Sequence, residues 1–341
     1  MSRALDPDAA ASIVASNSQA AYNDIVEALN SSTSELFDIE FLGKSHPPPP
    51  GRNVLLEGTS IGLPKIKLVE AFVVARQIFF KLLKDFRADN FQDIQNATAV
   101  ILLMDPEHIT AANARKRIIQ HFRAGPMVNL SNVLQKELLV IDSLLTSRLH
   151  RHTKSPTLWG HRRWLLEVLS SLEFPHDTQR DLETVILVAA ERHPRNYYGW
   201  LHLRWLLSDY QSSGYALRDS PAIEHSTMLS TVKDWCLRHP ADTSGWSFIL
   251  FYLFSIELPH TRLETSSAIC REVLGLAISF KWTHESVWVF LRTLVASENI
   301  QRDQRLSFFK AIEVLLAAQP EDSKARKILE ASHDWCLGCS V

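Results

Sequence analysis

Two stretches of the chain share one pattern: TKSPTLWGHRRWLL at residues 153–166 and HPRNYYGWLHLRWLL at residues 193–207. Both contain Trp-x-His-x-Arg-Trp-Leu-Leu in the same order. Tryptophan is a rare residue, and its return in a fixed order with His and Arg indicates a repeated structural unit. The apolar residues in both stretches recur at spacings of three and four, which is typical of a helix.

Weaker copies of the pattern lie on both sides. The aligned positions are 41 to 47 residues apart: Ala112, Trp159, Trp200, Trp246 and Trp288. A second apolar, helix-periodic segment follows each copy, at 132–149, 178–192, 221–238, 261–278 and 303–318. One repeat is therefore a helical hairpin. We expect an all-α protein in which five to six TPR-like hairpins stack into a crescent-shaped α-solenoid.

The start of each repeat has a local cause. Pro106, Pro194 and Pro240 lie six residues before the aligned position, where a proline ends the preceding helix. The residues four positions before the Trp in three copies are favoured N-caps: Ser155, Asn196 and Asp242. The sequence therefore predicts that a helix begins directly after each of these three residues.

The N-terminal part differs in composition from the repeats. The first forty residues are polar and small, with one apolar helix-like stretch around AYNDIVEALN. The loop HPPPPGRN follows at 46–53, where the prolines exclude a helix and a central strand. We expect two parts: this N-terminal region, whose order the sequence leaves open, and a single helical-repeat domain over 61–341. No stretch of strict alternation predicts a strand.

Composition excludes several functional classes. The 341 residues carry 36 Lys and Arg against 38 Asp and Glu, so no basic excess indicates a nucleic-acid partner. The most apolar window, 246–256, is too short to span a bilayer. The first residues lack an apolar signal segment, and we expect a cytoplasmic protein. The sequence contains no nucleophile elbow, Walker A loop, dinucleotide motif or zinc-ligand spacing, so we expect neither a catalytic residue nor a metal site.

The side chains of the motif allow two interpretations. They could pack between successive hairpins, with the arginines stacked on rings or bonded to carbonyls. Alternatively, some of the His, Tyr and Arg side chains could line a surface that meets a partner or an anion. The set comprises Trp159, His161, Arg162, Arg163, Trp164, Trp200, His202, Arg204, Trp205, Trp246 and Trp288.

The stretch PRNYYGWLHLRW, and less fully SPTLWGHRRW, resembles the α-subunit repeat of protein prenyltransferases. The resemblance covers about residues 60–320, with departures at four motif positions: Ala112 replaces a Trp, Leu203 and Ile249 replace the family's Arg, and Phe248 replaces its His. It implies a crescent that wraps a β-subunit, which holds the catalytic zinc. The chain itself would bind no cofactor and would be inactive alone.

The resemblance also implies a reaction and partners. We expect a non-catalytic α-subunit for geranylgeranyl transfer from the diphosphate to C-terminal cysteines of membrane-traffic proteins. The implied β partner is the one of the Rab geranylgeranyl transferase. The positions that match the family's diphosphate contacts are Arg195 and Tyr197, where a cation would stabilise the departing diphosphate. Arg195 could instead be a solvated residue, and the chain a stand-alone protein-binding scaffold without enzymatic role.

Overall fold

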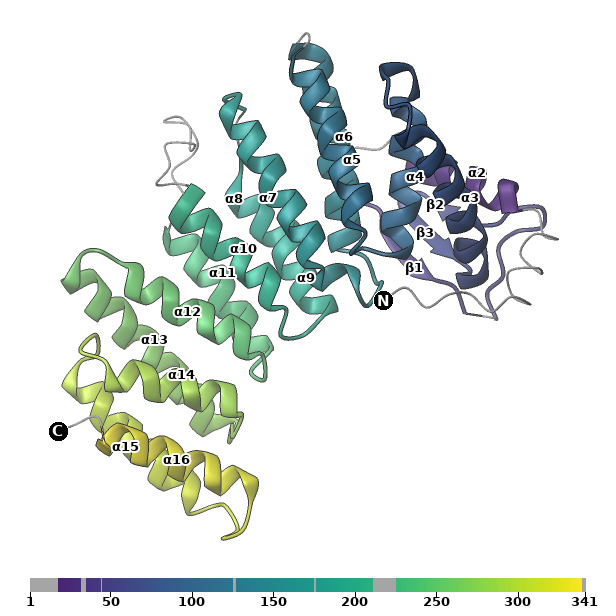
Figure 1. The fold of residues 1–341 in the computed structure, drawn as a ribbon. Coiled ribbons are helices and arrows are strands. Elements are labelled where there is room, and N and C mark those ends of the chain that lie inside the picture. Colours follow the sequence, from purple (N-terminus) through teal and green to yellow (C-terminus); the bar gives the residue numbers. More distant parts are fainter. Residues whose placement is uncertain are drawn as a thin grey trace. The chain divides into compact units, whose positions relative to one another are not determined.

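The computed structural model describes residues 18–31, 35–43, 45–124, 127–174, 176–210 and 225–338. The chain divides into two compact units, Met1–Ser220 and Pro221–Val341. The predicted division into residues 1–60 and 61–341 stays a prediction. Helices make up most of both units, as Figure 1 shows, which confirms the predicted helical-repeat fold. The crescent shape of the array stays a prediction.

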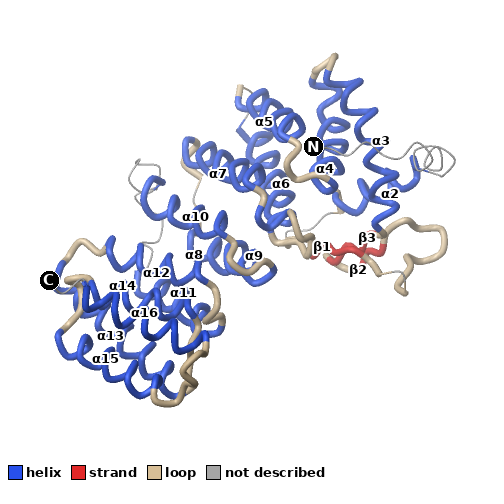
Figure 2. Tube along the Cα trace, turned by 60° about the horizontal axis from the view of Figure 1, so that its bottom comes forward, coloured by secondary structure: helices blue, strands red, loops and turns tan. Residues whose placement is uncertain are grey.

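The first unit begins with a helix and a small sheet. Helix α2 (Ser18–Leu29) packs on α3 (Lys65–Leu83) and α4 (Phe91–Met104). A short 3-10 turn, η1 (Ala88–Asn90), leads into α4. Between α2 and α3 lie strands β1 (Asp38–Phe41), β2 (Leu55–Glu57) and β3 (Ser60–Leu63), drawn red in Figure 2. Residues 46–53 connect β1 to β2 as a loop, as predicted.

The sheet corrects the expectation that this region contains no strand. Its order is β1-β3-β2, with β1 parallel and β2 antiparallel to β3. Each strand has only three or four residues, too few to display an alternating pattern. The β2–β3 hairpin turns at Gly58, whose φ of +59° favours glycine. Gly62 of β3 lies so close to Leu42 that a Cβ would meet its Cδ2 at 2.6 Å.

The first unit continues with hairpins at the predicted places. The first pairs α5 (Ile109–Arg123) with α6 (Met127–Leu145). The second begins with the short 3-10 turn η2 (His152–Lys154) and α7 (Pro156–Ser171). Its returning segment is α8 (Thr178–Asp181), the π-helical turn η3 (Leu182–Ile186) and α9 (Leu187–Arg192). The third first helix is α10 (Tyr197–Trp205), which continues as the π-helical turn η4 (Leu206–Tyr210).

The second unit is built in the same way. It comprises α11 (His225–Arg238), α12 (Thr243–Ser255), α13 (Pro259–Ser279), α14 (Glu285–Ala296), α15 (Arg302–Leu316) and α16 (Lys324–Gly338). Helix α14 packs between α12 and α16. None of the helices in the described part of the chain is both long and apolar enough to cross a lipid bilayer.

The predicted caps are confirmed. The side chain of Ser155 accepts a hydrogen bond from the N–H of Leu158, and that of Asn196 accepts one from Gly199. Asp242 accepts from the N–H groups of Ser244 and Gly245. Each cap satisfies donors that the first helical turn leaves without a partner inside the helix. His108 caps α5 in the same way, through Ala111.

Buried tryptophans connect three of the hairpins to their own entry turns, and two of these tryptophans also contact the next hairpin. The indole N–H groups of Trp159, Trp246 and Trp288 each donate to the carbonyl six residues earlier, over 2.9 to 3.2 Å. Trp159 also contacts the His202 ring of the next repeat, with ring centres 5.1 Å apart. Trp246 makes the equivalent contact with Phe290 at 4.9 Å. The repeats thus stack through the Trp of one and the residue two positions after the Trp of the next.

Candidate functional site

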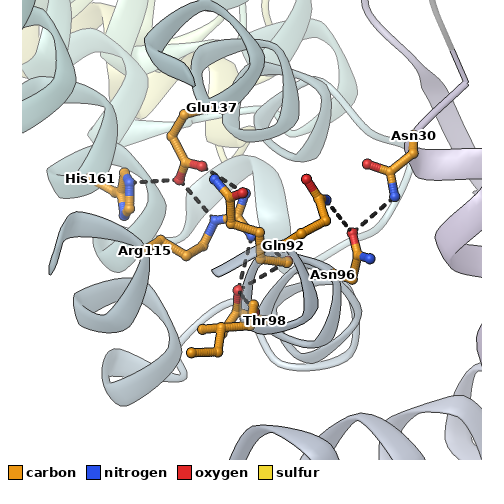
Figure 3. Close-up of polar contacts among 9 residues, drawn as sticks. Asn30, Gln92, Asn96, Thr98, Arg115, Glu137 and His161 are labelled. Atoms are coloured by element: carbon orange, nitrogen blue, oxygen red, sulfur yellow. Dashed lines mark hydrogen bonds and ion pairs between the residues drawn. The ribbon is translucent and has the colours of Figure 1, made fainter. Parts of the chain in front are cut away.

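A buried ion pair joins the two helices of the first hairpin. Arg115 of α5 donates from Nε to Oε1 of Glu137 on α6 over 2.8 Å, and from Nη2 to Oε2 over 2.7 Å. The Nη1 group of Arg115 donates to the Gln95 carbonyl and to the Thr98 hydroxyl of α4. His161 of α7 completes the group, with Nε2 2.9 Å from Oε1 of Glu137. Figure 3 shows Glu137 between Arg115 and His161.

The carboxylate of Glu137 stays ionised in this setting. Burial alone would raise its pKa, but the charge of Arg115 and the hydrogen bond from His161 lower the pKa to about 2. Burial lowers the pKa of His161, so its ring is neutral at pH 7. The group therefore holds one cation and one anion, and it ties repeat two to repeat one.

A second buried group joins three repeats. Arg162 of α7 has no exposed surface, and its Nε donates to Oδ1 of Asp142 on α6 over 2.7 Å. Its Nη2 lies 2.6 Å from Oδ2 of Asp181 on α8. Its Nη1 lies 2.8 Å from Nε2 of His202 on α10. His176 approaches Asp181 at 3.1 Å.

The pKa values of the side chains around Arg162 shift in different directions. Burial, and the nearby charge of Asp181, raise the pKa of Asp142 to about 6 although Arg162 opposes the rise. Burial would also raise the pKa of Asp181, but Arg162 and His176 lower it below its usual range. Burial and then Arg162 hold the pKa of His202 well below 6.5. His202 is therefore neutral, and its Nε2 can accept from the guanidinium.

Sequence reasoning missed the acidic members of both groups. Glu137 continues the apolar stripe of Leu130 and Leu134 on α6, at helical spacing. A carboxylate on a core-facing stripe indicates a buried cationic partner. That signal is visible in the sequence, but it does not say which Arg the partner is.

The remaining side chains of the motif differ in how far they are buried. Trp200, Trp246 and Trp288 are buried, as are Trp159 and Trp205. Trp164 and Arg204 are half-buried. Arg163 is exposed, and its guanidinium lies 4.6 Å from the centre of the Trp205 ring in the next repeat. His161, Arg162 and His202 are the buried polar members described above.

Arg195 and Tyr197 are exposed on either side of Asn196, the N-cap of α10. Arg195 has a φ of +62°, and its carbonyl accepts from the N–H of Tyr197 over 2.8 Å. The intervening Asn196 is buried, and its Nδ2 donates to the carbonyls of Thr153 and Ala189. Tyr197 is 61% exposed. The anchored Asn196 thus holds its two neighbours outward, where a ligand or partner can reach them.

Basic side chains of the preceding repeat adjoin this turn. The His150 and His193 rings lie 5.1 Å apart, and Lys154 and His150 both contribute, after burial, to lowering the pKa of His193. We call His150, Lys154 and His193 the basic corner. Sequence reasoning missed its two histidines and Lys154, because they come from the turns of two different repeats.

Nothing in the described residues brings three His, Cys, Asp or Glu side chains into a metal-binding group. Cys336 is buried in α16, whereas its CxxC partner Cys339 lies outside the described residues. The zinc expected in a β-subunit concerns another chain and stays a prediction.

Together these helical hairpins define a helical-repeat protein. Comparisons with known proteins agree. Residues 158–274 match the family model of the ECM9 middle domain. The chain is 27% identical over 184 residues to protein prenyltransferase alpha subunit repeat-containing protein 1-B of Xenopus laevis, covering 49% of this chain and 38% of that protein.

Two further relatives extend the match. Protein prenyltransferase alpha subunit repeat-containing protein 1 of Homo sapiens is 26% identical over 218 residues, which cover 59% of this chain and 49% of that protein. Protein ECM9 of Saccharomyces cerevisiae is 27% identical over 188 residues, which cover 55% of this chain and 47% of that protein. The chain thus spans less than half the length of these relatives. The resemblance that the repeat motif predicted is confirmed.

Proposed function

We propose that this chain is the non-catalytic, α-type subunit of a heterodimeric protein prenyltransferase. In this proposal it wraps a zinc-bearing β-subunit, of the type found in the Rab geranylgeranyl transferase. The pair transfers a geranylgeranyl group from its diphosphate to a C-terminal cysteine of a membrane-traffic protein. The names of the relatives support an α-subunit-type repeat, and the observation that carries the proposal is the outward turn of Arg195 and Tyr197.

The turn suits contact with an isoprenoid diphosphate. The diphosphate gains negative charge as its bond to the isoprenoid breaks, and a fixed cation nearby stabilises that charge. Arg195 is exposed and follows His193 of the basic corner by two residues. A guanidinium offers planar paired donors that match two phosphate oxygens. The exposed Tyr197 hydroxyl adds a further donor.

Reconstitution of the pair tests the proposal. The tagged full-length chain is co-expressed with a prenyltransferase β-subunit and purified, and the complex is given labelled geranylgeranyl diphosphate and a peptide with a C-terminal cysteine. We expect co-purification in equal amounts and labelled peptide, with no transfer by either chain alone. A chain that does not retain the β-subunit would contradict the proposal.

The second candidate is a stand-alone scaffold that binds protein without chemistry. Apolar residues in the second unit favour it, because Phe248 and Ile249 occupy the His and Arg positions and are buried. Its signature would be a stable complex with another protein in the absence of any β-subunit, and no transfer from the reconstituted mixture.

Replacing Arg195 tests its role in the first candidate. Arg195→Ala should lower turnover by up to about 100-fold while the heterodimer stays intact, because one donor to the departing diphosphate is lost. Arg87→Ala is the matched control, since Arg87 is also exposed and precedes a helical turn, far along the chain from the corner. Equal turnover of the wild type and the Arg195 variant would remove Arg195 from the site.

A further inference from the structure

Helix α3 is apolar on two opposite faces, and only one of them is buried. The helix packs on α2 and α4, and its buried face includes Leu68, Ala71, Ala75 and Phe79. A helix that is apolar all round is normally covered on every side. The second apolar face of α3 nevertheless stays exposed or half-exposed in the part of the chain that the structure describes.

The second face has the spacing of a coiled-coil seam. Six of its residues lie at alternating intervals of three and four, as the a and d positions of a heptad repeat do. We call these six residues the α3 seam: Ile66, Val69, Val73, Arg76, Phe80 and Leu83. The seam is about 26 Å long at the rise of an α-helix. Ile66 is 58% exposed and Phe80 is 41% exposed, so the seam offers apolar surface to another helix.

Arg76 is the only polar member of the seam, and two rings restrict its side chain. The guanidinium carbon lies 5.7 Å from the centre of the Phe72 ring and 5.7 Å from that of Phe80, one turn to either side. A guanidinium that contacts rings through its face keeps its N–H donors for an acid. Arg76 makes no hydrogen bond or ion pair within the described residues. Its donors are therefore available, and the rings reduce the entropy that it loses when a carboxylate binds.

The rest of the helix adds positive charge without matching acids. Helix α3 and the residue after it contain four lysines, at 65, 67, 81 and 84, and a single acid, Glu70. Glu70 is buried, and its Oε2 lies 2.9 Å from Nζ of Lys67. The other three lysines are exposed and form no ion pair with any described residue. The whole chain carries 36 Lys and Arg against 38 Asp and Glu, so this positive charge is local to the helix.

We propose that the α3 seam docks an acidic amphipathic helix of a partner protein, which packs its apolar residues along the seam and places a carboxylate on Arg76. The heptad spacing argues for a helix, and charge complementarity argues for an acidic one. The proposal concerns α3 rather than the turn of Arg195, and it does not rest on prenyl transfer.

Two other occupants fit the seam less well. A second copy of this chain would bring Arg76 and the exposed lysines of two α3 helices together, and like charges across an interface are unfavourable. An anionic membrane would attract the lysines. Insertion of the seam would, however, bury Arg76 among lipid tails that offer it no acceptor.

Binding of a designed helix to the full-length chain tests the proposal. The probe is a fluorescein-labelled peptide of three heptads, with Leu at the seam positions, Glu on both flanks and one Glu within the seam, followed by anisotropy at near-physiological salt. Arg76→Glu should weaken binding by about 10-fold or more, because a charge-assisted pair becomes a repulsive one. Ile66→Ser should weaken it about 5-fold, since apolar contact is lost. Hydrogen exchange in α3 should slow when the peptide binds.

A charge swap gives a result that misfolding cannot imitate. A peptide with Lys in place of the seam Glu should bind Arg76→Glu more tightly than it binds the wild type, because the pair is restored with reversed signs. Arg271→Glu is the matched control, since Arg271 is also an exposed arginine within a long helix, α13 of the second unit. It should leave the affinity for both peptides unchanged.

Four outcomes would overturn the proposal. One is equal binding of a peptide with the same composition and a scrambled seam, which would mean non-specific charge attraction. Another is an Arg76→Glu variant that binds both peptides as the wild type does. A third is a dimer of the wild-type chain in sedimentation that Ile66→Ser abolishes, which would assign the seam to a second copy. The fourth is tighter binding to phosphatidylserine vesicles than to the peptide, with the same sensitivity to Arg76→Glu, which would assign the seam to a membrane.

Discussion

Arg162 carries a full charge with no exposed surface, and it contacts side chains from three other segments of the first unit. Its repeat position is occupied by Arg115 in the first repeat and by Leu203 in the third. Because Leu203 is apolar and buried, the third repeat brings no guanidinium of its own. Its His202 instead receives the Nη1 group of Arg162. Leu203 thus ends the series of buried arginines at this repeat position, which begins with Arg115 and continues with Arg162.

Replacing Arg162 should strongly destabilise the first unit. Arg162→Leu leaves Asp142 and Asp181 buried without their cation, and breaking a buried pair in this way costs about 3 to 5 kcal/mol of unfolding free energy. The triple variant Arg162→Leu, Asp142→Asn, Asp181→Asn should recover part of the loss. Urea unfolding measures both. If the triple variant is no more stable than the single one, uncompensated carboxylates are not the cause.

His152 should make the protein sensitive to acid. Burial lowers its pKa to about 4, and Nε2 lies 3.0 Å from the Leu102 carbonyl. The unfolded value is near 6.5, so the unfolded state binds the proton first and stability falls as the pH drops from 6.5 to 4. The shift corresponds to about 3 kcal/mol over that range.

His152→Gln keeps a donor to Leu102 and removes the titration, so unfolding free energy measured by urea at stepped pH should fall less steeply below pH 6.5. The exposed His150→Gln serves as control and should keep the wild-type slope. A His152→Gln variant with the full wild-type slope would show that other groups cause the acid sensitivity.

Among the elements, the helix starts depend on single buried caps. Asn196 connects three elements: it caps α10 through the N–H of Gly199, donates to the carbonyl of Ala189 in α9, and donates to the carbonyl of Thr153 in the turn before α7. Thr153 also receives the indole N–H of Trp159. The cap is therefore both a local stop signal and a contact between repeats.

Asn196→Ala should cost more than an ordinary cap. A cap replacement costs about 1 kcal/mol, and leaving a buried carbonyl with fewer donors adds a similar amount. Asn196→Asp keeps the acceptor for Gly199 and loses the donors to Thr153 and Ala189, so it separates the two parts. Urea unfolding of both variants measures how much the cap and how much the two donated hydrogen bonds contribute to the free energy of unfolding. Equal stability of Asn196→Ala and the wild type would exclude a role of Asn196 between repeats.

The small sheet shows where element prediction fails. Its strands are short, and β1 is held from far along the chain: its Ile39 carbonyl accepts from the N–H of Arg148, and Asp38 pairs with Arg148 and Arg192. No local pattern in residues 38–63 encodes these partners. The long helices, in contrast, carry periodicity and caps within their own residues, and they lie where the sequence predicts them.

At the scale of the molecule, the two units use different chemistry at the same repeat positions. In the first unit, His and Arg side chains meet buried carboxylates between repeats. In the second, Phe248, Ile249 and Phe290 fill the corresponding places, and Trp246 packs on Phe290. Repeat arrays can unfold in segments because each repeat contacts only its neighbours.

We therefore expect damage in one unit to stay local. Asp242→Ala removes the cap of α12 and should speed hydrogen exchange in α12 and in α14, which packs on it. Exchange in α5, α6 and α7 should stay at the wild-type rate. Mass spectrometry of peptic fragments reads both regions in one sample. Faster exchange throughout the chain would mean that the two units unfold as one.

The sequence by itself determined the helical hairpins, their starting points and the repeat register, because periodicity, proline stops and side-chain caps act within a few residues. It also placed Arg195 and Tyr197 on either side of the cap Asn196 at a helix start. Only the tertiary structure decided which carboxylate meets which Arg, that Arg163 stacks on Trp205, and that His150 and Lys154 lie near His193. These contacts join residues far apart in the chain, so they depend on how the hairpins stack, which no local pattern specifies.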